Sequence, residues 1–151
     1  MRKGQRSRKA TSHTNAANEK RPVAGRKGGD TKILFFSDVH FPFQNHAAVD
    51  RLLDHVASEQ FDVIIHGGDG IDAYSVSKYN PDPARLLQLQ AECDEQGEFL
   101  AEINRLQPKA RKLYLLGNHE ERIPAYVRRQ APALESLRGL GMDSVLQTSE
   151  N

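Results

Sequence analysis

The sequence predicts an α/β fold in which a mainly parallel sheet is flanked by helices. The prediction rests on three short, nearly continuous apolar runs, at residues 32–37, 61–66 and 112–116, which have the length and composition of buried strands. Runs of this kind are typical of a parallel sheet that is covered on both faces. Each run is followed directly by a turn that contains Asp or His, and ligands of such sheets bind at the carboxyl ends of the strands.

Composition divides the chain of 151 residues into two parts. Residues 1–30 carry nine Lys/Arg and two acidic residues, a net charge of +7, whereas the rest holds 12 Lys/Arg and 18 Asp/Glu, a net charge of −6. The first part has too few apolar residues to offset the entropy of ordering. We therefore expect residues 1–30 to be a disordered basic tail and residues 31–151 to form one domain. The tail suits salt-sensitive attachment to nucleic-acid phosphates, or else it is a solvated extension.

The single cysteine excludes an internal disulfide and favours a reducing compartment, so we expect a cytoplasmic protein. Cys93 lies on an apolar stripe, where a cysteine acts as a small buried hydrophobe. No stretch approaches the roughly 18 to 20 apolar residues of a membrane span. The amino terminus lacks the apolar centre of a secretory signal. These features predict no association with a membrane.

The segment after the first strand predicts a helix. Asn45 can cap it, and it extends to about Gln60. Its apolar stripe comprises Ala48, Val49, Leu52, Leu53 and Val56. The helix should pack on the sheet as the crossover to the second strand, with His46 and His55 on its surface.

A second long helix is predicted before the third strand. Asp82 and Pro83 are favourable cap and first-turn residues, and apolar residues then recur at roughly helical spacing. Gly97 could bend or divide this helix. Beyond the third strand, residues 123–140 predict one or two short helices broken at Pro132, and residues 141–151 have no clear periodicity.

Five side chains with metal-binding atoms follow the predicted strands: Asp38, His40, Asp69, Asn118 and His119. Because the carboxyl ends of parallel strands lie at one edge of a sheet, we expect these residues to converge. Asp and His supply oxygen and nitrogen ligands, a mixture that suits two divalent ions, Mn above all, with Fe or Zn as alternatives. Asp69 lies in a Gly-rich turn that permits close approach to an ion, which makes it the best candidate for a bridging carboxylate.

These residues belong to three motifs: Asp38-Val39-His40, Gly68-Asp69-Gly70-Ile71-Asp72 and Gly117-Asn118-His119-Glu120. Together the motifs resemble those of the calcineurin-like metallophosphoesterase superfamily. The surrounding sequence, Asp38-Val39-His40-Phe41-Pro42-Phe43 and Asp72-Ala73-Tyr74-Ser75, is similar to that of phage or prophage members. The resemblance covers roughly residues 31–125. It implies the first half of a four-layer α/β/β/α sandwich, in which two sheets pack face to face between helices.

The resemblance also implies a role for each motif residue. Asp38 and His40 would hold the first metal, Asp69 would bridge, and Asn118 would bind the second metal. His119 would protonate the leaving oxygen, oriented by an acidic neighbour that is either Asp72 or Glu120.

Two further residues are candidates for substrate binding. Arg122 follows the third motif and could clamp a phosphate, although an ordinary surface salt bridge explains it equally well. Tyr74 lies in a polar segment, residues 73–82, that either contacts substrate or serves only as a connector.

The chain departs from the family pattern in one respect. Family members supply further histidine ligands from a carboxyl-terminal half, and this sequence has no histidine after His119. We therefore expect residues 31–151 to be a calcineurin-like phosphoesterase domain truncated at its carboxyl end, with one sheet face exposed. A second chain could complete the site. His66 could replace a ligand, but a histidine at the end of a buried strand more often packs against a neighbouring element.

Three interpretations compete. The first is a metal-dependent phosphoesterase that hydrolyses phosphate mono- or diesters, including nucleotides or nucleic acid, by a two-metal-activated water. The second is a catalytically impaired remnant that binds metal or nucleic acid without turnover. The third is an unrelated parallel α/β domain whose Asp and His residues only cap strands.

Overall fold

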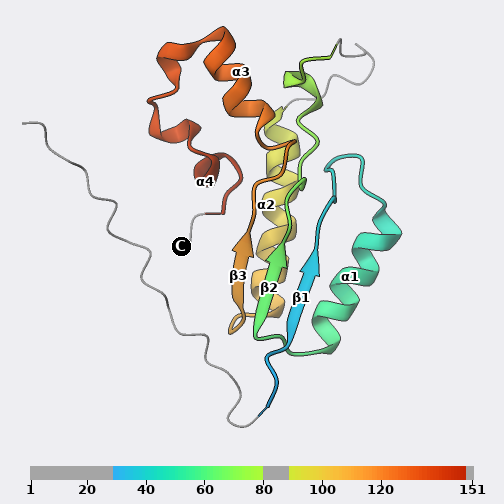
Figure 1. Cartoon of the computed structure of the whole chain (residues 1–151). Coiled ribbons are helices and arrows are strands. Elements are labelled where there is room, and N and C mark those ends of the chain that lie inside the picture. Colours follow the sequence, from blue (N-terminus) through green and yellow to red (C-terminus); the bar gives the residue numbers. More distant parts are fainter. Residues whose placement is uncertain (1–28, 80–88, 149–151) are drawn as a thin grey trace, which may run out of the picture.

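The computed structural model describes residues 29–79 and 89–148. Three strands within these ranges form one parallel sheet in the order β1-β2-β3: β1 (Ile33–Phe36), β2 (Val63–His66) and β3 (Arg111–Tyr114). Figure 1 shows the three arrows side by side with their carboxyl ends at the same edge. The predicted α/β class and parallel sheet are confirmed. The expected tail lies largely outside the described residues.

Helix α1 (His46–Ser58) connects β1 to β2 as predicted. The Asn45 side chain accepts a hydrogen bond from the amide of Ala48 at 3.2 Å and so caps the first turn. Val56 is fully buried, and the other large members of the predicted stripe are partly buried against the same core. Ala48 is exposed, because it lies in the first turn at the margin of the stripe.

Helix α2 (Leu89–Leu106) connects the second and third strands. It is continuous through Gly97, so of the two alternatives at this glycine, bending or division, division is wrong. Gly97 is buried, and a Cβ atom there would lie 2.6 Å from the end of the flexible Gln147 side chain, which would have to move. The expected cap at Asp82 and Pro83 lies outside the described residues.

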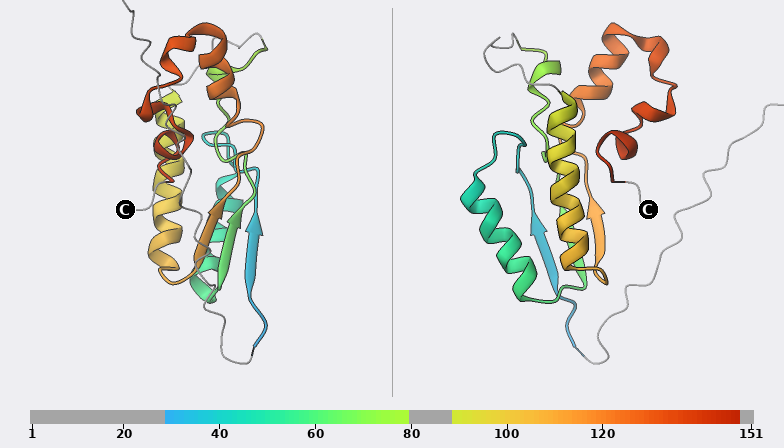
Figure 2. Two further views of the ribbon diagram at one scale, coloured as in Figure 1. Left: turned by 60° about the vertical axis from the view of Figure 1, so that its left-hand side comes forward. Right: turned by 180° about the vertical axis from the view of Figure 1, so that it is seen from behind.

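Both long helices cover the same face of the sheet, and they lie in front of the strands in the right-hand view of Figure 2. In β1 the opposite face is open, since Ile33 and Phe35 are 55% and 61% exposed. The cover on both faces that the apolar runs predicted is therefore wrong for β1 among the described residues, whereas the exposed sheet face that the resemblance implied is present there. The central strand β2 is largely buried, as predicted. A continuous apolar run indicates which residues suit burial, but it does not show what covers them.

Two hydrophobic clusters support the sheet. The first lies between the sheet and the two long helices, and it comprises Phe41, Phe61, Ile64, Phe99, Ile103 and Ala110. The second lies beyond the ends of the strands, and it comprises Ile71, Ala73, Cys93, Ile123 and Leu146. Burial raises the pKa of the Cys93 thiol to about 11, as expected for a buried hydrophobe.

The chain after β3 forms short helices around the second cluster. Helix α3 (Arg122–Gln130) and the 3₁₀ turns η3 (Pro132–Leu134) and η4 (Arg138–Leu140) confirm the predicted break at Pro132. A four-residue helix, α4 (Met142–Val145), follows in the segment without periodicity. One turn is too short to produce a periodic pattern.

The fully buried Leu146 should anchor this last segment to the rest of the domain. Leu146→Ala should lower the free energy of unfolding by about 2 to 4 kcal/mol, because it leaves a cavity in the second cluster. Leu137→Ala is the control, since Leu137 is 53% exposed. Urea denaturation measures both. Equal effects of the two substitutions would contradict the packing described here.

Candidate metal centre

Backbone pairing continues beyond the strands and brings three turns together. The amides of Asp38 and His40 donate to the carbonyls of Gly68 and Asp69, each at 3.1 Å. Phe41 then pairs with Ile71 in an isolated parallel bridge. The turn after β1 is thus bound directly to the turn after β2. The predicted convergence of the strand-end residues begins with these backbone bonds.

The turn after β3 approaches the turn after β2 so closely that side chains would not fit between them. A Cβ atom on Gly68 would lie 2.5 Å from the amide nitrogen of Gly117. A Cβ atom on Gly117 would lie 2.2 Å from Oδ1 of Asp69. The two glycines therefore permit a contact that any other residue would prevent.

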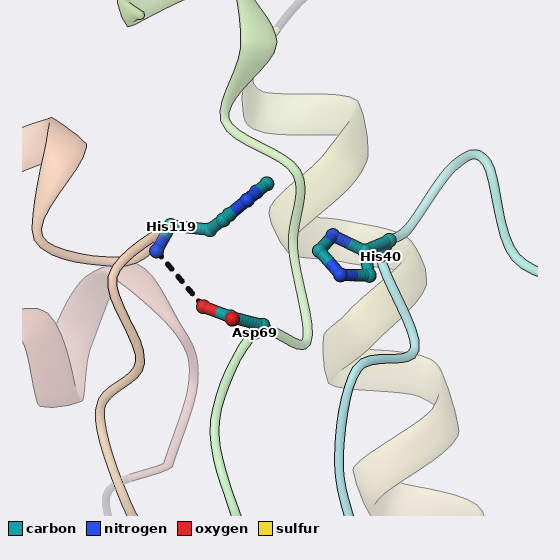
Figure 3. Close-up of side chains that lie close together, drawn as sticks. All are labelled: His40, Asp69 and His119. Carbon is teal, nitrogen blue, oxygen red and sulfur yellow. Dashed lines mark hydrogen bonds between the residues drawn. The ribbon is translucent and has the colours of Figure 1, made fainter.

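Three side chains, one from each turn, form a candidate metal group. His40, Asp69 and His119 each offer a ligand atom, and these atoms lie within 4.8 Å of one another. Figure 3 shows the three side chains around one point, with the backbone amide of His119 donating to Oδ1 of Asp69 at 2.9 Å. The rings of His40 and His119 meet edge to face with their centroids 4.5 Å apart.

The backbone at this site adopts conformations that are unusual for residues with side chains. Among the described residues, positive φ angles at non-glycine positions include 61° at Asp38, 57° at His40 and 54° at Asp69. Such conformations persist only where the surrounding structure enforces them, and they concentrate at functional sites. The strain here falls on three of the residues predicted to bind metal.

Asp72 lies beside both histidines. Its Oδ2 atom is 3.5 Å from Nδ1 of His40 and 3.6 Å from Nδ1 of His119. The carbonyl oxygen of Asp72 lies 2.9 Å from Nδ1 of His119. Of the two acidic neighbours that the sequence offered for orienting His119, Asp72 has the appropriate position.

Arg122 completes the surroundings of His119. Its Nη2 atom lies 2.9 Å from Nε2 of His119, and its Nη1 atom donates to the carbonyl of Asp72 at 2.8 Å. Because a guanidinium group only donates, Nε2 accepts this bond, and Nδ1 of His119 carries the proton that is donated to the Asp72 carbonyl. The Arg122 contacts thus define the tautomer and the ring orientation of His119.

Glu120 points into the protein, where its side chain is fully buried. Its two carboxylate oxygens accept hydrogen bonds from the amides of Asp69, Gly70 and Gly117 and from the hydroxyl of Tyr114. Burial alone would raise the pKa of Glu120, but these hydrogen bonds outweigh burial and hold its pKa below the usual range. Its carboxylate contacts the backbone of the turns.

The remaining predicted residues lie at the margin of this arrangement. Asp38 is 65% exposed, with its Oδ1 atom 3.8 Å from Nε2 of His40. Asn118 is exposed between Gly117 and His119. Tyr74 begins the 3₁₀ turn η1 (Tyr74–Val76), and its ring lies 6.5 Å from that of Phe43. The three-residue metal group thus includes His119, expected as a proton donor, and leaves out Asp38.

His66 has the structural position that the sequence favoured. It is 2% exposed, its ring stacks on Tyr114 at 4.5 Å, and its Nδ1 atom accepts from the amide of Gly68. Burial lowers its pKa to about 4, so His66 is neutral near pH 7.

Sequence reasoning missed the buried polar residues behind the site. Gln96 donates to the hydroxyl of Tyr114 at 2.7 Å, and Glu92 accepts from the amide of Ala73 at 2.6 Å. The spacing of these residues could have revealed them, because positions 92 and 96 fall on the apolar stripe of α2. Polar residues on such a stripe indicate a buried hydrogen-bond network.

The residues present fit a divalent metal. Two imidazoles and a carboxylate are the donor types that Mn, Fe and Zn accept. Nδ1 of His40 is buried without a hydrogen-bond partner among the described residues, and it lies 3.5 Å from Oδ2 of Asp72. The fit therefore depends on donor chemistry, two imidazoles and a carboxylate close together.

Fold and site together define a parallel α/β domain with a candidate metal centre at the ends of its strands. The sequence model of the calcineurin-like phosphoesterase family matches residues 31–146. The chain belongs to this family, whose members typically bind divalent metals, and membership indicates metal-dependent phosphoester hydrolysis. Searches of curated proteins and of solved structures gave no match. Among the described residues, no helix combines the length and apolar character needed to cross a membrane.

The buried Glu92 makes stability depend on pH. Burial raises the pKa of Glu92 to about 7, so the folded state binds its proton more tightly than the unfolded state. The protonated Glu92 side chain contributes fully to the free energy of unfolding below about pH 4.5, and this contribution is lost as the pH rises through about 7. Gln does not titrate, so Glu92→Gln does not undergo this loss. The free energy of unfolding of Glu92→Gln minus that of wild type should therefore increase by about 2 kcal/mol from pH 4.5 to pH 8.

Urea denaturation across this pH range checks the prediction. The matched control is Glu98→Gln, since Glu98 lies on the exposed side of α2. A stability difference between Glu92→Gln and wild type that stays constant with pH would contradict it.

Proposed function

We propose that this chain hydrolyses phosphate mono- or diesters with two divalent metal ions, Mn in the first place and Fe or Zn as alternatives. The single observation that carries the proposal is the convergence of His40 and Asp69, which offer metal ligands, with His119 beside them, one residue from each strand-end turn. Bound at this site, two divalent ions would polarise a phosphoryl oxygen and lower the pKa of a water molecule. The proposed nucleophile is such a water.

The chain's own residues divide into metal-binding and proton-transfer groups. Asp69 is the proposed bridging ligand, because its carboxylate lies next to His119 in Figure 3, within 4.8 Å of a ligand atom of His40, and its turn is held by both neighbouring turns. His40 and Asp38 are proposed for the first metal. Asn118 is proposed as a ligand of the second metal, because its side chain is exposed and so accessible to an ion.

His119 is proposed to protonate the leaving oxygen. Its Nδ1 proton is held by the Asp72 carbonyl, and its Nε2 atom accepts a hydrogen bond from Arg122. For the transfer, Arg122 would have to move away and Nε2 would have to take up a proton from solvent, which it would then deliver to the leaving oxygen. A substrate phosphate offers the guanidinium a stronger, charge-assisted partner. Arg122 is thus proposed to bind the phosphate, with Tyr74 as a further substrate contact.

Nucleotides or nucleic acid are proposed as substrates, with the basic residues 1–30 as an additional attachment to nucleic-acid phosphates. A second proposal is a protein that binds metal or nucleic acid without turnover. It is favoured by the small number of ligands, because the candidate metal group among the described residues has only two imidazoles and one carboxylate. A second chain that supplies ligands would reconcile the two proposals.

Hydrolysis of bis-p-nitrophenyl phosphate and p-nitrophenyl phosphate by metal-free protein, with Mn²⁺ added back, tests the first proposal. His119→Ala should lower kcat by roughly 10²- to 10⁴-fold, the range typical of a positioned proton donor. Asp69→Asn should abolish Mn²⁺-dependent turnover. His46→Ala, at an exposed position on α1, should leave turnover unchanged. Tight Mn²⁺ binding without turnover would instead support the non-catalytic proposal.

The role of Arg122 is tested by Arg122→Lys and Arg122→Ala. Loss of the two-pronged guanidinium should raise KM roughly tenfold or more, with the larger effect in Arg122→Ala, since Lys keeps the charge alone. Steady-state kinetics on the same esters measure this effect. Arg129→Ala, at an exposed position on α3, is the control. An unchanged KM in Arg122→Ala would contradict phosphate binding by this residue.

A further inference from the structure

The carboxylate of Glu120 joins the turns that carry Asp69 and His119. Its Oε2 atom accepts from the amide of Asp69 at 2.9 Å and from the amide of Gly117 at 2.8 Å. Its Oε1 atom accepts from the amide of Gly70 at 2.8 Å and from the hydroxyl of Tyr114 at 2.6 Å. One side chain therefore bonds to the turn after β2 and to the turn after β3.

These bonds act on a strained segment. Asp69 has a φ of 54°, a left-handed conformation that is unfavourable for a residue with a side chain. Its amide and the next one along both point at Glu120, which gives the left-handed turn two charge-assisted hydrogen bonds. Because Glu120 is fully buried, water does not compete for these amides. The carboxylate thus stabilises a conformation that the chain would otherwise avoid.

The conformation of this turn determines where the Asp69 side chain points. Oδ1 of Asp69 accepts from the amide of His119, a bond that requires both turns to be in their present positions. Glu120 contacts the backbone on either side of this bond. It is therefore positioned to hold the Asp69 carboxylate and the His119 ring in register.

We propose that Glu120 is a positioning residue, whose carboxylate holds the Asp69 turn in its left-handed conformation against the Gly117 turn and thereby aims Asp69 at the metal. Tyr114 and Gln96 belong to the same hydrogen-bond network, because Gln96 donates to Tyr114 and Tyr114 donates to Glu120. The last step, aiming at a metal, rests on the proposed function. The clamp between the two turns does not.

Hydrogen exchange measured by NMR on metal-free protein tests the clamp. In Glu120→Gln, the amides of Asp69, Gly70 and Gly117 should exchange roughly tenfold faster relative to the amide of Gly67, because hydrogen bonds to a charged acceptor are lost. The Gly67 amide is a suitable reference, because it lies in the same turn as Asp69 and Gly70 but donates to the carbonyl of Phe36 in β1 instead of to Glu120. Unchanged exchange at the three amides would overturn the proposal.

Two further variants keep the test decisive if Glu120→Gln fails to fold. Glu120→Asp keeps the charge but shortens the side chain, and it should accelerate the same three amides. Tyr114→Phe removes one donor and leaves the amide bonds in place, so it should accelerate them less than Glu120→Asp does. An equal or larger effect of Tyr114→Phe would contradict a clamp that acts through the amides.

Mn²⁺ affinity, measured by electron paramagnetic resonance of the free ion, tests the second step. Glu120→Asp should weaken binding roughly tenfold or more, whereas Leu146→Ala, a destabilised variant that keeps every hydrogen-bond donor to Glu120, should bind as wild type does. An equal loss in both variants would overturn a specific positioning role. If the wild-type protein bound no divalent ion, the proposed function would fail, and the exchange measurement would still decide whether Glu120 clamps the turns.

Discussion

Parallel pairing of three strands is the constraint on which the site depends. The strands end at one edge, and their hydrogen bonding continues into the turns, where His40 pairs with the Asp69 carbonyl. Residues separated by about half the chain are thereby held within one small group. Gly68 and Gly117 permit the last approach between the turns after β2 and β3. The candidate metal centre is thus a consequence of strand alignment combined with two positions that lack side chains.

Behind the three side chains of the candidate metal centre lies a buried polar layer. Glu120 accepts backbone amides from two turns, Tyr114 and Gln96 extend the network to α2, and Glu92 accepts the amide of Ala73. Buried polar groups are costly unless they are paired, and nearly all of the polar atoms in this layer have partners. The layer explains how strained backbone at Asp69 and Ala73 persists, since each of these amides has a buried carboxylate as its partner.

Much of this arrangement is predictable from the sequence, for physical reasons that differ between elements. The apolar runs predicted the strands, Asn45 predicted the start of α1, and Pro132 predicted the break after α3. The convergence of His40, Asp69 and His119 follows from parallel topology. The position of Glu120 could not be predicted, because a carboxylate next to a histidine suits orientation of that histidine and bonding to the backbone equally well. The open face of β1 was expected from the family resemblance and not from its apolar run, whereas the one-turn helix α4 was beyond prediction, since one turn leaves no periodic signal.

The central claim is that the three strand-end turns form a single metal centre. The most direct measurement is a Mn²⁺ titration of the ¹⁵N-labelled protein, followed by paramagnetic broadening of its amide signals. We expect the amides near His40, Asp69 and His119 to broaden together at the same Mn²⁺ concentrations, while those in the second half of α1 stay sharp. Broadening confined to one turn, or spread over exposed carboxylates across the surface, would contradict the account.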